Sequence, residues 1–329
     1  AVRAAGGIAW STERPHKAFR YANDDGVLFF EADTFKEAYA SPVVGQKALV
    51  VELMKDAAVG DAEGAFVQDG RSYVNRKILL RSHGATRRTL TRSGGSNLLY
   101  LFGGAEGSVV SNVVLTADAE TYGGAFVLGS GGGTHYLGDG CEIRPPEGLQ
   151  GLCLGGSSSS FARLVMLPGS KITGCRKDVP GVAVECRAAG AILDVRGGEI
   201  SGNVGKSAIL PFHDGGKSPV FVSGGARIAD NHDFAGKCAN LRFETAQGLL
   251  VQTGDLTEDA EVYVRLNDVK DGVFGVSSNE TAGCYQAWKG AERIRSDARK
   301  SLFGSSLAAD EVVRLVWTKL SKGALLVVR

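Results

Sequence analysis

Histidine–aspartate pairs and adjacent carboxylates are the side chains of this sequence that could support acid–base chemistry or bind a metal. Two such pairs occur, His213–Asp214 and His232–Asp233, both in stretches whose composition is typical of loops. The adjacent carboxylates Asp24 and Asp25 have the composition of a turn. A structural role in loops is favoured for each pair, and a catalytic or metal-binding role is the alternative for the two histidine pairs.

The cysteines and the small-residue segments lack the spacings of known sites. The six cysteines are Cys141, Cys153, Cys175, Cys186, Cys238 and Cys284. They form no Cys-x-x-Cys pair and no Cys/His cluster at zinc spacing, so buried strand positions are favoured over disulfides. Gly131 to Gly133 lacks the strand-to-helix context of a phosphate loop, and Ser157 to Ser160 has the composition of a corner loop. We therefore expect no catalytic residues, no cofactor and no metal site.

Composition favours many short strands over helices. Glycine makes up 46 of the 329 residues, about twice the usual share of ~7%. Interior glycine disfavours helices, and the 43% of hydrophobic residues is enough to build a core. With 37 basic and 36 acidic side chains, the chain has no broad attraction to nucleic acid. No apolar stretch approaches the ~18 residues of a membrane helix, so we expect no membrane insertion.

A repeat in the middle of the chain indicates how these side chains are positioned. Ile172, Ile200 and Ile228 recur at intervals of 28 residues (from 172 to 200 and from 200 to 228), each after a glycine-containing turn. Ile143 precedes them in nearly the same register, and one more step back reaches Leu115. Several short strands per period are typical of one coil of a β-solenoid, in which neighbouring coils align identical positions. The sequence therefore predicts an inward column of isoleucines.

Asparagine recurs at the same period, three residues after the isoleucines. Asn203 and Asn231 suit sharp corners, where asparagine tolerates the left-handed conformation and can hydrogen-bond the next asparagine in the stack. Cys175 shares this register, which predicts a corner residue rather than a nucleophile. A polar ligand site is the alternative for the asparagines.

The same 28-residue ruler tests for stacked carboxylates, which glycoside cleavage would need on adjacent coils. A step of 28 residues carries Asp139 to Leu167 and Asp194 to Val222, and a step back carries Asp214 to Cys186. No ladder of aspartates results. We therefore expect no hydrolysis or elimination of pectin, alginate, hyaluronan or neutral plant glycans, unless irregular loops assemble a site around one of the histidine pairs.

The ends of the chain differ from the repeat. A helix is expected over residues 32 to 40, with Phe35, Ala38 and Tyr39 on one face and Asp33 as N-cap. Near the other end, the spacing over residues 285 to 303 suggests a helix. Residues 312–317 and 324–328 have the pattern of a β-hairpin. We expect one domain over residues 1–329, with an N-terminal cap over 1–47, coils over 48–275 and a C-terminal cap over 276–329.

Several segments together resemble the adhesin-like β-helix proteins of bacterial surfaces, which have pectate-lyase-like architecture. The segments that carry the resemblance are residues 51–56, 77–80, 88–91, 101–104, 112–115, 197–203 and 222–231. The resemblance covers roughly residues 30–275. Two features depart from the family pattern: Arg144-Pro145-Pro146 replaces a corner, and no cell-wall sorting signal follows the hairpin.

The repeat and the resemblance together imply an all-β, right-handed parallel β-helix with a short capping helix and a C-terminal hairpin. The resemblance further implies export, a location outside the cell and a noncatalytic display or adhesion role. Glycans or proteins of a host or microbial surface are the expected partners of a monomeric chain. A polysaccharide lyase or glycoside hydrolase on the same scaffold is the alternative.

Overall fold

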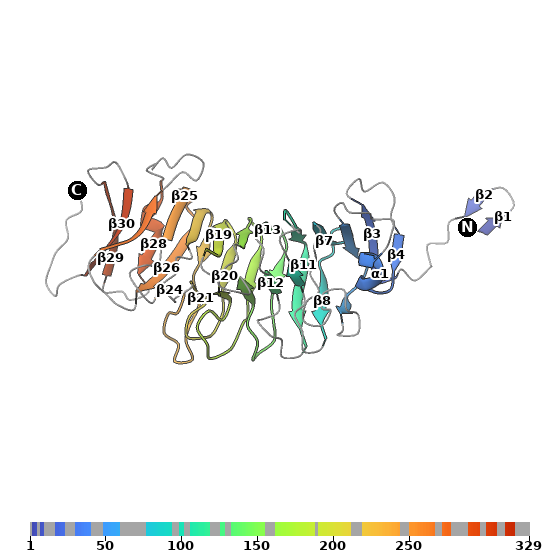
Figure 1. The fold of residues 1–329 in the computed structure, drawn as a ribbon, viewed down its shortest axis with the longest axis horizontal. Coiled ribbons are helices and arrows are strands. Elements are labelled where there is room, and N and C mark those ends of the chain that lie inside the picture. The colour runs from blue at the N-terminus through green and yellow to red at the C-terminus, as the bar shows by residue number, and fades with distance from the viewer. Residues whose placement is uncertain are drawn as a thin grey trace.

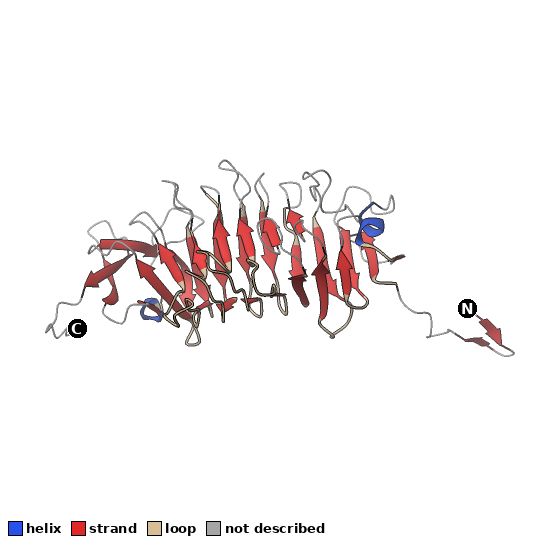
Figure 2. Cartoon of the chain, turned by 90° about the horizontal axis from the view of Figure 1, so that it is seen from below, coloured by secondary structure: helices blue, strands red, loops and turns tan. Residues whose placement is uncertain are grey.

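Short apolar strands separated by glycine-containing corners stack into an elongated parallel β-solenoid (Figure 1). The computed structural model describes residues 2–4, 7–9, 17–23, 30–40, 49–59, 77–93, 99–101, 106–118, 126–128, 133–154, 162–187, 190–211, 219–243, 250–266, 272–277, 289–296, 301–307 and 313–319. Figure 2 shows the strands side by side along the long axis, with a short helix near the N-terminal end of the stack. The expected β-helix class is confirmed.

One face of the solenoid is a long sheet, here called sheet I. Its strands in chain order are β3 (Phe19–Asn23), β4 (Phe30–Ala32), β5 (Leu49–Leu53), β7 (Ile78–Ser82), β10 (Val109–Ser111), β13 (Thr134–Leu137), β16 (Arg163–Met166), β19 (Ile192–Arg196), β22 (Val220–Gly224), β25 (Leu250–Leu256), β27 (Gly272–Ser277), β29 (Ser301–Leu307) and β30 (Val313–Lys319). From β5 to β27 neighbouring strands pair in parallel. Each coil therefore adds one strand in the same direction.

The second face, sheet II, is built from the strands that follow those of sheet I. They are β6 (Ala57–Val59), β8 (Arg88–Arg92), β11 (Val113–Ala117), β14 (Glu142–Ile143), β17 (Lys171–Thr173), β20 (Glu199–Ser201), β23 (Arg227–Ile228) and β26 (Glu261–Leu266), with β28 (Ile294–Ser296) paired to β26. A coil such as β16, then β17, thus turns from sheet I to sheet II within a few residues.

The third face, sheet III, completes each coil and joins sheet II at β26. Its strands are β9 (Leu99–Leu101), β12 (Phe126–Leu128), β15 (Leu152–Leu154), β18 (Val184–Cys186), β21 (Ile209–Leu210) and β24 (Leu241–Phe243). A separate antiparallel pair, β1 (Val2–Ala4) with β2 (Gly7–Ala9), lies before the stack. Three strands per coil, one in each sheet, surround a common interior.

The predicted isoleucine column is confirmed. Ile143 pairs with Ile172, Ile172 with Ile200, and Ile200 with Ile228, and each side chain is fully buried. The column continues to Leu115 on one side and beyond Ile228 on the other. Stacking identical positions lets each coil bury an apolar side chain that it could not bury alone.

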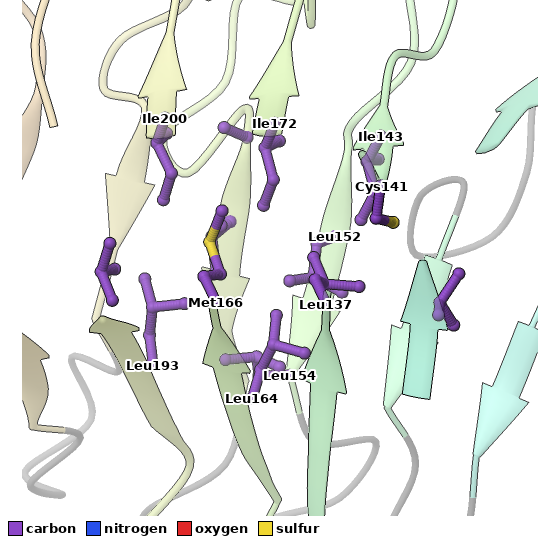
Figure 3. Close-up of a cluster of buried hydrophobic side chains, with 14 of the residues drawn as sticks. Leu137, Cys141, Ile143, Leu152, Leu154, Leu164, Met166, Ile172, Leu193 and Ile200 are labelled. Carbon is purple, nitrogen blue, oxygen red and sulfur yellow. The ribbon is translucent and has the colours of Figure 1, made fainter. Parts of the chain in front are cut away.

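All three sheets contribute to the dry interior (Figure 3). Met166 of sheet I, Ile172 of sheet II and Leu154 of sheet III are each fully buried within one continuous cluster. The glycine turns before the isoleucines are needed for this packing. A Cβ built on Gly198 would lie 2.6 Å from Cβ of Met166, so a side chain there would force the coil apart.

The asparagines form the expected corner ladder, with one correction. The side-chain amide of Asn203 donates to Oδ1 of Asn231 at 2.8 Å, and Oδ1 of Asn203 accepts from the backbone N–H of Cys175 at 3.0 Å. The left-handed conformation belongs to the residue before each ladder position. Gly202 and Asp230 have φ values of 66° and 55°. The asparagines are therefore there for their hydrogen bonds rather than for backbone freedom.

The N-terminal end of the solenoid is covered as predicted. Helix α1 (Phe35–Ala40) packs on β3 and β4, with Phe35 and Ala38 fully buried and the Phe35 ring edge-on to Phe19 at 5.8 Å. Thr34, and not Asp33, is the N-cap, since its hydroxyl accepts the backbone N–H of Glu37 at 3.2 Å. The antiparallel strands β3 and β4 end the parallel ladder at this edge.

The C-terminal end differs from the expectation. Residues 294–296 and 301–307 are strands, and only Ala291–Arg293 form a single 3-10 turn, so the helix expected over 285–303 is wrong for the residues described. Ile294 instead pairs with Val262 of sheet II and is buried. A hairpin does form, but β30 pairs with β29; residues 324–328, expected as its second strand, lie outside the described residues.

Among the residues described, no helix has the length and apolar character needed to span a membrane. The boundaries of 47 and 275 between caps and coils stay a prediction.

Candidate binding surfaces

Only one of the histidine–aspartate pairs lies in the described structure. His213–Asp214, Asp24–Asp25 and Ser157–Ser160 fall outside it. His232 and Asp233 lie in the corner turn between β23 and β24, where the backbone of His232 bridges to Val204 and Cys238. The Asp233 carboxylate accepts the backbone N–H groups of Ala235 at 2.8 Å and Lys237 at 2.9 Å. These contacts give Asp233 a structural role in holding the turn.

The aspartates of the regular coils have no carboxylate beside them in their rows. On sheet I the neighbours of Asp194 are Val165 and Phe221, and not Val222 as a uniform 28-residue step indicates. The coil is one residue shorter on this face between β19 and β22. The exposed Asp139 lies in a turn whose backbone C=O accepts the N–H of Asn112 at 2.7 Å. Neither position brings two acids together.

A row of charged side chains runs along the outer face of sheet II, one residue before the isoleucine column. In register order it is Glu142, Lys171, Glu199, Arg227 and Glu261, here called the charged row. The signs alternate at every coil. Because neighbouring strands lie about 4.8 Å apart, each charge faces one of opposite sign at close range.

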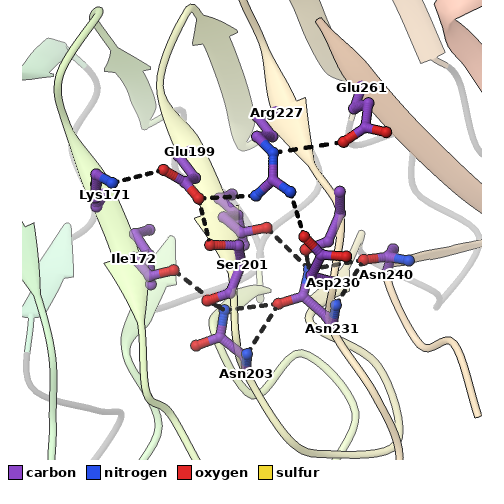
Figure 4. A network of polar contacts seen from close by, with 12 residues as sticks. Lys171, Ile172, Glu199, Ser201, Asn203, Arg227, Asp230, Asn231, Asn240 and Glu261 are labelled. Carbon is purple, nitrogen blue, oxygen red and sulfur yellow. Dashed lines mark hydrogen bonds and ion pairs between the residues drawn. The ribbon is translucent and has the colours of Figure 1, made fainter. Parts of the chain in front are cut away.

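Ion pairs connect the charged row (Figure 4). Lys171 Nζ lies 2.8 Å from Glu199, whose other oxygen lies 2.8 Å from Arg227. Arg227 also contacts Glu261 at 3.5 Å and pairs with Asp230. At the far end, Glu142 is flanked by Arg87 at 3.0 Å from a neighbouring corner. Each carboxylate of the row is therefore neutralised in place.

The ionisation of the row follows from these contacts. Partial burial opposes the charge on Glu199, but hydrogen bonds from Lys171 and Ser201, with the charge of Arg227, outweigh it and hold the pKa below its usual value. The same contacts work in the other direction on Arg227, where Asp230, Glu199 and Glu261 outweigh burial and raise the pKa. The row therefore carries fixed, paired charges at neutral pH.

The sequence does contain a signal for this row. Each charged side chain stands immediately before a residue of the column, as in Glu199–Ile200 and Arg227–Ile228. Since successive strand residues face opposite sides, an inward isoleucine places its predecessor outside. A search restricted to aspartates missed it.

A second cluster lies on the outer face of sheet I. Asp194 is fully buried, and one carboxylate oxygen accepts hydrogen bonds from Arg163 of the preceding coil and from Arg196 at 2.8 Å. The guanidinium of Arg163 also lies over the Phe221 ring at 5.2 Å. The other oxygen, Oδ1, has no hydrogen-bond partner. The cluster joins one carboxylate, two cations and an aromatic ring from adjacent coils.

A third feature is an exposed aromatic ring at the corner between sheets II and III. Phe234 occupies the tip of the turn that Asp233 holds, and the guanidinium of Arg176 lies over its ring at 4.9 Å. Arg176 Nε donates to Glu147 Oε1 at 2.9 Å. The sequence gives no periodic signal for Phe234, because corner turns vary in length from coil to coil.

The cysteines described have no features of nucleophiles at the buried positions. Cys141, Cys153, Cys175 and Cys186 are free and buried, whereas Cys238 is free and exposed. Burial raises the pKa of each buried thiol, that of Cys153 to about 12. The expected strand and corner positions are confirmed for these four. Cys284 lies outside the described residues.

Within the described residues, histidine, cysteine and acidic side chains do not gather in groups of three or more that could hold a metal ion. No protein-family model matches the sequence, and no match is found among curated proteins or solved structures.

Proposed function

We propose that this β-solenoid is a noncatalytic display module, a rigid scaffold that presents its outer faces and corner turns to glycans or proteins. The observation that carries the proposal is the charged row. A glycosidase acid is a carboxyl kept protonated by a raised pKa next to a second carboxylate. In the row, the pKa of Glu199 is lowered and its register neighbours are Lys171 and Arg227. Such paired charges suit recognition more than proton transfer.

The resemblance of the repeat segments to adhesin-like proteins supports a location outside the cell, on a bacterial surface or in the secreted fraction. In that setting, partners would be glycans or proteins of a host or of other microbes, bound by a monomeric chain. A solenoid suits this role because its coils contact only their neighbours, so outer side chains can vary without disturbing the core.

A carbohydrate-active enzyme is the second candidate, and the Asp194 cluster favours it. Elimination on an acidic polysaccharide needs a cation near the uronate and a base. Arg163, Asp194 and Arg196 place two cations and a carboxylate on adjacent coils of one sheet. However, Asp194 is fully buried, whereas a base that takes a proton from a polymer must reach it directly or through one water.

A glycan array probed with the full chain tests the proposal, with a parallel assay for reducing ends and unsaturated uronates. Display predicts retention of at least one class of glycan, or of a purified surface protein, with no product. The variants Arg163→Ala and Arg196→Ala sharpen the result. If the wild-type chain releases product and both variants lose that activity, the enzyme reading replaces display.

A further inference from the structure

Phe234 is exposed where a turn needs no aromatic residue. Among the residues whose side chains the structure describes, it is the one large hydrophobic side chain that faces solvent, with 51% of its surface exposed. Turn tips are usually glycine, asparagine, aspartate or serine, as Gly236 illustrates at a φ of 75°. An exposed ring leaves its apolar area in water and adds little to the stability of the fold. A role outside the fold would account for it.

The turn that holds Phe234 is well ordered by hydrogen bonds. Besides the two backbone N–H groups held by its carboxylate, Asp233 donates its own N–H to the C=O of Lys237 at 2.8 Å. Its C=O in turn accepts the N–H of Gly236 at 3.0 Å. The ring is therefore held on a preorganised support, which lowers the conformational entropy lost when a ligand binds.

Two polar side chains complete the surface beside the ring. Arg176 and Glu147 come from the corners of two preceding coils, and their side chains are 45% and 76% exposed. Arg176 lies against the ring at 4.9 Å and is held by Glu147 at 2.9 Å. A flat apolar face, a planar set of donors and a planar set of acceptors thus meet at one exposed corner.

We propose that Phe234, Arg176 and Glu147 form a contact site for a neutral pyranose unit of a glycan. The proposal rests on the display function and names the place and the ligand class. The ring offers a face for the C–H side of a sugar, while guanidinium and carboxylate can serve its neighbouring hydroxyls. Because the two charges neutralise each other, the site has no net charge to favour a uronate or a sulfate.

The test uses the full chain on an array of neutral oligosaccharides from cellulose, mannan and galactan, with hyaluronan and chondroitin sulfate fragments as acidic probes. The neutral probe retained most strongly is then measured by calorimetry. We expect Phe234→Ala and Phe234→Leu to weaken binding about tenfold or more, while Phe234→Tyr, which keeps the ring, binds as wild type. Arg176→Met is expected to weaken binding about threefold to tenfold.

Lys237→Ala, an exposed change in the same turn, is the matched control and should leave affinity unchanged. Thermal unfolding of each variant shows that the fold is intact. If Phe234→Ala binds a neutral glycan as tightly as wild type, the site is wrong while the display function stands. If wild type retains only the acidic probes, the ligand class is wrong. If it retains no glycan at all, the site and glycan display both fail.

Discussion

The two faces of each sheet II strand differ in what fixes their residues. Facing inward, Ile143, Ile172, Ile200 and Ile228 repeat one residue type, because the interior between coils accepts one shape at that position. Facing outward, the residues one place earlier change sign at every coil while keeping their register. The interior therefore selects for identity and the surface for complementarity, and only the surface leaves room for partners to be chosen.

The largest expected effect is on the inner face. Ile200→Ala should lower the free energy of unfolding by about 2–5 kcal/mol, because it removes buried methyl groups and leaves a cavity between two coils. Ile200→Val is the graded control, with an expected loss of about 0.5–1.5 kcal/mol. Denaturant unfolding measures both. A loss below about 1 kcal/mol for the alanine variant would mean that the column is not core.

The corner ladder should come next. Asn231 accepts the N–H of Asn203 at 3.1 Å and its side-chain amide at 2.8 Å, and donates to the C=O of Ile200 at 2.9 Å. Asn231→Ala leaves these buried groups unpaired and should cost about 1–3 kcal/mol or more. Urea unfolding checks this. A variant as stable as wild type would show that water replaces the ladder.

Glu52 gives a pH test at the N-terminal end of sheet I. Arg81 lies 2.7 Å and His83 2.9 Å from this nearly buried carboxylate. Burial opposes its charge, but hydrogen bonds from His83 and Arg81 and the charge of Arg20 outweigh it, so the pKa is below the ordinary 4.5. Ionised Glu52 therefore contributes stability above about pH 4.5, and this contribution is lost as the pH falls through the lowered pKa.

Glu52→Gln should accordingly be less stable than wild type at pH 7, by about 1–2 kcal/mol. The difference should shrink as the pH falls below about 4.5. Melting temperatures across pH 3 to 8 for both proteins measure it. A difference that grows on acidification would contradict the lowered pKa.

How far the sequence predicts the molecule depends on which of these rules applies. The column, the asparagine ladder and helix α1 follow from burial, which repeats with the coil, so residues such as Ile172 and Asn203 identify them. The charged row follows the same register but was not predicted, because its members alternate in sign and only aspartates were compared.

Features without a period could not be predicted. The turn that carries Phe234 occurs once, and nothing in its neighbours indicates that the ring faces solvent. The Asp194 cluster depends on a coil one residue shorter than its neighbours on that face. Ile294 was assigned to a helix from local spacing, whereas pairing with Val262 draws it into sheet II. Long-range pairing decides such cases.

The smallest expected effect is on the outer face. Glu199→Gln, next to Ile200 in the same strand, should cost about 0–1 kcal/mol, because its partners Lys171 and Arg227 stay largely solvated. Unfolding in low and high salt checks this, with salt reducing the difference. A cost equal to that of Ile200→Ala would remove the distinction between the two faces.

The most direct test of noncatalytic display is the fate of a bound glycan. The glycan that the wild-type chain retains most strongly on the array is incubated with excess protein for a day and analysed by mass spectrometry. Display predicts that it is recovered intact, at its original chain length and without an unsaturated end. Shortened or unsaturated products, lost in the Arg163→Ala variant, would contradict display and establish the chain as an enzyme.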